Sequence, residues 1–189
     1  MKTTLLAIAV LAFAASGEAH ITLGDSKATT TQTGTGNTQT TDTSASETTQ
    51  TQGGTGNKQS VTSTKSNASQ GQSGTGNTQS INASGSKAAQ SQSGAGNRQS
   101  MGVTNSNAVQ TQTGTGNTQA VDASGSNTMQ VQSGVGNRQS TSSTGSNAVQ
   151  TQSGVGNQQS MNARGAGATQ NQTGITNTQS INVGGAAEK

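Results

Sequence analysis

The chain reads SNASQGQSGTGNTQS at residues 66–80, and variants of this stretch recur every 20 residues along most of the sequence. Three of its polar residues, Gln72, Asn77 and Gln79, return at this spacing with no slip in register. Such a regular period is typical of repeat proteins, in which equivalent units stack on one another. The predicted organisation is a signal peptide at 1–19, a short leader at 20–25, eight 20-residue units at 26–185 and a tail at 186–189.

The first 19 residues have the three parts of a secretory signal peptide. Lys2 supplies the positive end, residues 5–15 form an apolar run, and small residues precede a predicted cleavage site between Ala19 and His20. A membrane anchor is the alternative, but the apolar run is too short to span a bilayer comfortably. We therefore expect the chain to be secreted.

The composition argues against a conventional globular core. Only 24% of the 189 residues are hydrophobic, and Phe13 is the single aromatic residue. A chain of this kind is either disordered or a solenoid whose layers each bury a few side chains. The low charge content of 8% and the absence of proline favour β-rich self-association over a solvated coil. Disorder of the isolated monomer before assembly stays open at this point.

Within each unit, side chains alternate between two faces along two short arms, as they do in β-strands. In the unit that begins at Ser66, one face carries Ser66, Ala68, Gln70 and Gln72 in the first arm, and Asn77, Gln79, Ile81 and Ala83 in the second. Every charged residue of the units falls on the opposite face or in a turn, so we interpret this polar and aliphatic face as inward. The larger aliphatic residues predicted to point outward are Val109, Met129, Val131 and Val149.

Glycine-rich turns are predicted to join the arms, because glycine and asparagine tolerate the positive φ of a tight arc. The first-turn glycines we single out are Gly74, Gly76, Gly94, Gly96, Gly114 and Gly116. A second turn precedes each new unit, where Ala45 and Lys65 break a pattern of glycine or asparagine. The predicted fold is all-β: a β-solenoid of eight strand-turn-strand coils, stacked parallel and in register in a cross-β arrangement.

Stacking in register places identical amides above one another. Each buried amide could then donate to one neighbour and accept from the other, which removes a penalty of roughly 1–3 kcal/mol per unpaired group. The residues predicted to form this assembly ladder are Ser66, Gln70, Gln72, Asn77, Gln79, Gln92, Asn97, Gln99, Gln112, Asn117, Gln119, Gln132, Asn137, Gln139, Gln152, Asn157 and Gln159.

The pattern Ser-x5-Gln-x-Gly-x-Gly-Asn, present at residues 46–57 and 106–117, resembles the repeat of the curlin family. Members of that family are secreted bacterial subunits of curli, a functional amyloid. The resemblance implies polymerisation outside the cell, roles in biofilm matrix and surface adhesion, and assembly through Ser, Gln and Asn ladders. It also implies a secretion channel and a nucleating subunit as partners. The chain departs from the family in its shorter period and in carrying Gln79 where curlin repeats usually carry alanine.

Several kinds of chemistry are excluded by what the chain lacks. With no cysteine and one histidine, it offers no thiolate metal site, no Cys nucleophile and no repeated Ser–His–Asp set. A copper site at His20 would need a second histidine, and three aspartates cannot fill eight calcium loops. The scattered charge and missing aromatic platforms argue against nucleic acid. We expect no enzymatic activity, no cofactor, no metal and no small-molecule substrate.

Both end units carry the inward residues of the middle ones, Gln32 in the first and Gln172 in the last, so neither is an atypical capping repeat. Two open strand edges predict head-to-tail addition of further copies and an unlimited homopolymer. The alternative is an ice-binding or other ligand-binding monomeric solenoid. Its surface would be the outward Thr and Ser residues, such as Thr29, Thr31 and Thr33, although glycine, alanine and aliphatic residues interrupt that array.

Overall fold

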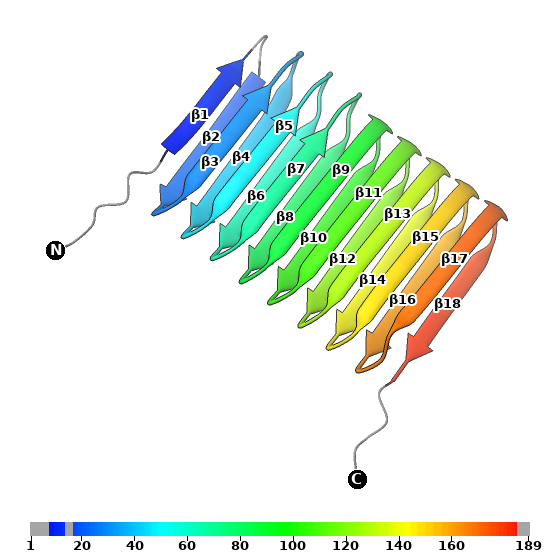
Figure 1. The fold of residues 1–189 in the computed structure, drawn as a ribbon. Helices are drawn as coiled ribbons and strands as arrows, with labels where there is room; N and C mark the ends of the chain where they lie inside the picture. The colour runs from blue at the N-terminus through cyan, green and yellow to red at the C-terminus, as the bar shows by residue number, and fades with distance from the viewer. Residues whose placement is uncertain (1–7, 14–16, 185–189) are drawn as a thin grey trace.

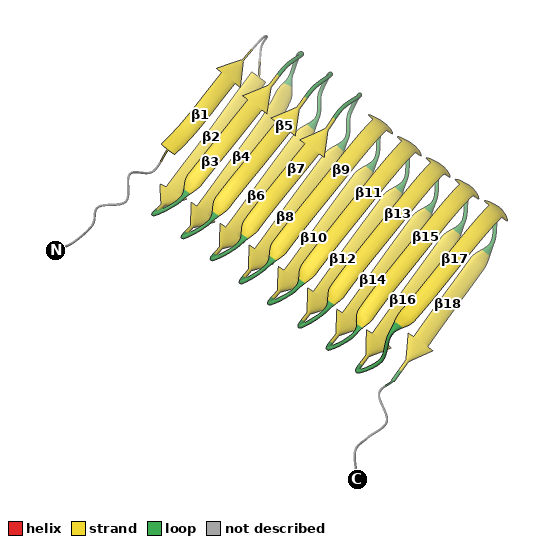
Figure 2. Cartoon of the chain, viewed as in Figure 1, coloured by secondary structure: helices red, strands yellow, loops and turns green. Residues whose placement is uncertain are grey.

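The structure is a computed structural model that describes residues 8–13 and 17–184. This part of the chain contains strands and no helix, so it includes no helix that could cross a membrane. Two parallel nine-stranded sheets face each other, and the chain passes from one to the other at every turn (Figure 1, Figure 2). The molecule is a β-solenoid, as predicted, and each of the eight units forms one coil.

The odd-numbered strands form the first sheet. They are β1 (Ile8–Phe13), β3 (Lys27–Gln32), β5 (Glu47–Gln52), β7 (Asn67–Gln72), β9 (Lys87–Ala95), β11 (Asn107–Thr115), β13 (Asn127–Val135), β15 (Asn147–Val155) and β17 (Ala168–Ile175). The even-numbered strands form the second sheet. They are β2 (Gly17–Gly24), β4 (Asn37–Ser44), β6 (Lys58–Thr64), β8 (Thr78–Ser84), β10 (Arg98–Thr104), β12 (Thr118–Ser124), β14 (Arg138–Thr144), β16 (Gln158–Arg164) and β18 (Thr178–Val183).

Within the second to seventh units, each strand pairs with its equivalents one unit before and one unit after. Gln72 lies opposite Gln92, and Gln79 lies opposite Gln99, so the pairing register equals the sequence period. Because side chains alternate along a strand, this register keeps all inward residues in the space between the two sheets. The inward and outward assignments made from the sequence are confirmed for the strands of the first seven units.

Two strands at the N-terminal end extend the stack beyond the predicted units. β1 pairs with β3, with Ile8 opposite Lys27, and β2 pairs with β4, with Ile21 opposite Thr41. The open edges of β3 and β4 present unpaired N–H and C=O groups that any extended segment can satisfy. The predicted leader therefore lies inside the solenoid as far as Gly24. Parts of the predicted signal peptide, at residues 1–7 and 14–16, and the predicted tail lie outside the described residues.

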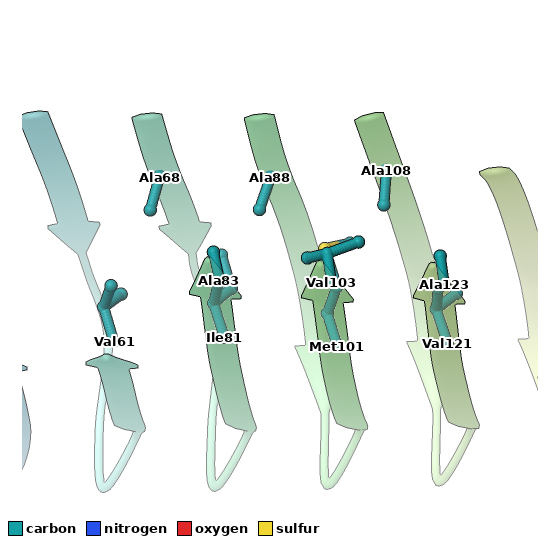
Figure 3. Packing of buried hydrophobic residues seen from close by; sticks show 10 residues of the cluster. All are labelled: Val61, Ala68, Ile81, Ala83, Ala88, Met101, Val103, Ala108, Val121 and Ala123. Carbon is teal, nitrogen blue, oxygen red and sulfur yellow. The ribbon is translucent and has the colours of Figure 1, made fainter. Parts of the chain in front are cut away.

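The space between the sheets has a polar half and an apolar half. Beside the Gly-Thr-Gly turns it holds the amides of Gln72 and Gln79 and their equivalents, which are almost fully buried. Beside the other turns it holds alanines of the first sheet, such as Ala68, and residues of the second sheet such as Ala83, with larger aliphatic side chains such as Ile81 next along the strand (Figure 3). Burial of each larger aliphatic side chain contributes roughly 1.5–3 kcal/mol.

One coil interrupts the apolar half. Residues 126–145 place Thr128, Thr141 and Ser143 where most other coils have alanine or an aliphatic residue, and this coil separates the two buried hydrophobic clusters. Thr141 finds partners, because its hydroxyl donates to Gln150 Oε1 at 2.6 Å and accepts from Gln130 Nε2 at 2.8 Å. The hydroxyl of Thr128 is buried without a partner. This coil is therefore a weak point of the stack.

The two glycines of the first turn are required for different reasons. Gly74 has a φ of 106°, and a Cβ there would overlap the carbonyl oxygen of Gly94 in the next coil. Gly76 has a φ of 62° but faces open space, so only its backbone conformation demands glycine. At the second turn, Ala45 and Lys65 adopt φ values of 50° and 49°, so the conformation persists where the glycine pattern breaks.

Candidate assembly interface

Glutamine side chains form a ladder along the axis of the solenoid. The Nε2 of Gln52 donates to the Oε1 of Gln72 at 3.0 Å, and the Nε2 of Gln72 donates to the Oε1 of Gln92 at 2.9 Å. The same bond joins every neighbouring pair from Gln32 to Gln172. Each amide inside this ladder therefore has a partner on both sides.

Two further glutamine ladders run parallel to the first. One extends from Gln50 to Gln170, and the other from Gln39 to Gln179 in the second sheet. In all three ladders the donor belongs to the coil nearer the N-terminus. The ladders therefore have a direction, and the two ends of the solenoid are chemically different.

The asparagines act on the backbone rather than on one another's amides. The Nδ2 of Asn77 donates to the carbonyl oxygens of Ser73 and Gly94, both at 2.8 Å, and its backbone N–H donates to the Oδ1 of Asn57 at 2.9 Å. The predicted amide-to-amide ladder is thus wrong for asparagine. Its side chain is one methylene shorter than that of glutamine, and it lies beside the carbonyls of the glycine turn. Asn77 fixes that turn to both neighbouring coils.

The serine that opens each of the first six units performs a similar task at the other turn. The hydroxyl of Ser66 donates to the carbonyl oxygen of Thr64 at 2.8 Å and accepts the backbone N–H of Ser86 at 3.0 Å. The hydroxyl satisfies backbone groups that the strand ladders leave free at the turn. Sequence reasoning placed Ser66 inward and in the assembly ladder, but did not predict that its hydroxyl joins the coils through backbone groups.

All of the residues predicted for the assembly ladder are buried, and the structure brings each into contact with its equivalents in neighbouring coils. The predicted turn glycines all adopt positive φ. The last coil differs, because Asn177 and Gln179 are exposed. No further coil covers them, so the final rungs of two columns face solvent.

Unpaired side-chain groups mark both ends of the ladders in the described part of the chain. At the C-terminal end, the Nε2 atoms of Gln170 and Gln172 are buried with no acceptor. At the N-terminal end, the Oγ1 of Thr30 and the Oε1 atoms of Gln32 and Gln39 are buried with no donor. Sequence reasoning found open ends but missed this polarity, because a sequence does not specify which way an amide points.

The outward surface carries threonine, serine and scattered charged residues. Thr29, Thr31 and Thr33 point outward as predicted, but Gly71 and Ala89 occupy two of the corresponding sites in later coils. All charged residues in the described ranges are exposed, and the ion pair found there joins Lys27 and Glu47 at 3.0 Å. Within the same ranges, no group of three or more His, Cys, Asp or Glu residues could hold a metal ion.

Comparison with protein-family models finds no match for this chain, and comparison with curated proteins finds no similar sequence. The geometry of the two ends therefore carries the functional proposal.

Proposed function

We propose that the chain is a structural subunit of a secreted, curli-like functional amyloid, in which copies add head to tail outside the cell. The fibre would serve biofilm matrix and surface adhesion. The observation that supports this most strongly is the complementarity of the two ends. Gln170 and Gln172 offer unpaired donors at one end, and Thr30 and Gln32 offer unpaired acceptors at the other. The 20-residue period places these residues in the same two columns.

A second copy stacked in register would satisfy these groups together. The Nε2 of Gln172 would donate to the Oε1 of Gln32 in the next copy, just as each glutamine of this column donates to the next one within the chain. β17 would pair with β3 of that copy and extend the first sheet across the junction. A buried amide left unpaired costs about 1–3 kcal/mol, so each matched pair favours addition. Gln179 and Gln39 lie in one column of the second sheet, so they would pair in the same way, although Gln179 is exposed before addition.

The N-terminal strands lie where the next copy would add. β1 covers the edge of β3, and β2 covers the edge of β4. Removal of residues 1–19 at the predicted cleavage site would free β3 and leave residues 20–24 on β4. Stacking of the last coil directly on the first would then require this short remnant to leave β4. In this proposal, cleavage during export precedes fibre growth.

The remaining partners follow from the resemblance to the curlin family. A secretion channel would deliver the chain to the outer surface, and a nucleating subunit would offer the first coil for addition. The proposal involves no catalysis, no cofactor and no nucleic acid.

The test uses the chain that begins at His20 and compares two substitutions on neighbouring residues of β17. In Gln172→Glu, the carboxylate can still accept from the Nε2 of Gln152, a bond of 2.9 Å, but it cannot donate to the next copy. In Asn171→Asp, the same change from amide to carboxylate occurs on an exposed, outward side chain. The charge change is identical, so the comparison separates a change at the inward junction from one on the outer surface.

Fibre growth is followed by thioflavin fluorescence, and fibres are identified by a diffraction spacing of about 4.8 Å along their axis. We expect the unsubstituted chain and Asn171→Asp to grow at the same rate. Gln172→Glu should grow at about a tenth of that rate or below it, since about 1.4 kcal/mol corresponds to a factor of ten. Equal growth of all three would refute head-to-tail pairing. A soluble monomer that shows thermal hysteresis and forms no fibres would favour the ice-binding alternative.

A further inference from the structure

The outer faces of the two sheets differ in where their charged residues lie. We define the first-sheet face as the three outward columns that begin at Thr29, Thr31 and Thr33 and continue every 20 residues through the eighth coil. No position in these columns is charged. The outer face of the second sheet carries the charged residues Asp42, Lys58, Arg98, Asp122, Arg138 and Arg164. The first sheet carries its outward charges in a fourth column, formed by the residues that open its strands, at Lys27, Glu47 and Lys87. Charged side chains on a sheet surface oppose association with another sheet, so the three columns of the first-sheet face lack this protection.

The first-sheet face also carries exposed apolar side chains. Val109 and Met129 are each 45% exposed and Val131 is 37% exposed, although each is large and hydrophobic. Val109, Met129 and Val149 stack on one another in register, and Val131 lies two residues from Met129 on the same side of β13. The rest of the face is Thr, Ser, Gly, Ala and Asn. The surface is therefore uncharged, with an apolar stripe over three coils.

The size of the first-sheet face fits a protein interface. Six residues of strand measure about 20 Å, and eight coils rise about 38 Å, which gives roughly 750 Å². A stable interface of standard size covers about 800 Å² on each partner. Dry association of uncharged β-sheet faces, with short side chains that interdigitate, is the usual way in which stacked sheets pair. Area, absence of charge and apolar content all suit a second copy of the same face.

From these observations we infer that the first-sheet face binds the same face of a second copy, which joins two solenoids side by side. A two-fold axis relates the copies, so each contributes the same residues to the contact. This lateral contact is independent of the pairing between coil ends. It would form between two single chains as well as between two filaments, with the charged second sheets on the outside.

The test places two lysines in one coil, on either sheet. Met129→Lys with Val131→Lys puts two charges on the first-sheet face in β13. Ser140→Lys with Ser142→Lys puts two charges on exposed outward residues of β14, in the same coil. Both variants keep every inward residue. Mass per unit length of the fibres is measured by dark-field electron microscopy, and the association state of the soluble chain by analytical ultracentrifugation.

We expect fibres of the unsubstituted chain and of the β14 variant to have twice the mass per length of the β13 variant. In solution we expect the unsubstituted chain and the β14 variant to be dimers and the β13 variant to be a monomer. Equal mass per length in all three fibres, or equal association states in solution, overturns the inference. Dimers without fibres would support the lateral contact and refute the proposed function. Fibres of equal mass per length in all three proteins would support the proposed function and overturn the lateral contact. A monomer whose thermal hysteresis is lost in the β13 variant would assign this face to ice and overturn the lateral contact.

Discussion

Replacement of Gln72 by alanine should weaken the solenoid far more than replacement of its neighbour Ser73. Gln72 is 4% exposed, accepts from Gln52 at 3.0 Å and donates to Gln92 at 2.9 Å. Alanine would leave the Nε2 of Gln52 and the Oε1 of Gln92 buried and unpaired. At about 1–3 kcal/mol for each group, the substitution should lower the free energy of unfolding by roughly 2–6 kcal/mol. Any cavity left by the side chain adds to this loss.

Ser73 is the matched control, because it is adjacent, points outward and makes no side-chain bond to the next coil. Its replacement by alanine should change the free energy of unfolding by no more than about 0.5 kcal/mol. Gln72→Leu keeps most of the side-chain volume but leaves the same two groups unpaired, so it separates hydrogen bonding from packing. We expect it to remain destabilised by an amount close to that of Gln72→Ala.

The assay is urea unfolding of freshly prepared chain, followed by circular dichroism, with the thioflavin lag time measured in parallel. Gln72→Ala and Gln72→Leu should unfold at lower urea concentrations and show longer lags than Ser73→Ala. Equal midpoints for Gln72→Ala and Ser73→Ala would refute the inward assignment. Full stability in Gln72→Leu would refute the claim that the amides, rather than packing, hold neighbouring coils together.

Three other predictions concern the turns, the core and the N-terminal strand. Gly94→Ala should abolish the β-sheet circular dichroism signal, because its Cβ would overlap the carbonyl oxygen of Gly114, whereas Gly96→Ala should cost only about 1–2 kcal/mol; equal losses would contradict this. Thr128→Val should raise the free energy of unfolding by about 1–2 kcal/mol in urea, since it removes a buried hydroxyl without a partner, and a decrease would count against it. The full chain should show a longer thioflavin lag than the chain from His20, because β1 covers the edge of β3; identical lags would show that β1 does not block addition.

The sequence predicts this fold well because the same few positions are repeated eight times. A single alternation such as Ala68, Gln70 and Gln72 is weak on its own, but every repetition tests it again. The charged residues give an independent test, since burial of an unpaired charge is too costly to occur by accident. The alternation and the placement of charges both depend only on position in the repeat, so they can be recognised without any knowledge of side-chain contacts.

Features that depend on direction or on context could not be predicted in this way. The orientation of the Gln ladders follows from how each amide rotates, and either orientation suits the same sequence. The role of Asn77 depends on which carbonyls the glycine turn leaves free. β2 belongs to no repeat, so Ile21 and Leu23 gave no periodic signal, although they lie opposite Thr41 and Thr43 of β4. Lys65 adopts a positive φ that its residue type does not indicate, whereas glycine or asparagine indicates this conformation in most other coils.

The columns of the core show why glutamine, rather than a larger apolar residue, is repeated without change. The column of Ile81 accepts Thr41, Val61 and Met101, because apolar packing has no direction and tolerates many shapes. The column of Gln79 accepts only glutamine, because each amide must both donate and accept at a fixed spacing. Apolar burial stabilises a coil, but a slip of one residue is opposed most strongly where polar groups would lose their partners. The amides therefore set the register within the chain, and the same requirement at its two ends would select a copy of the chain as the partner.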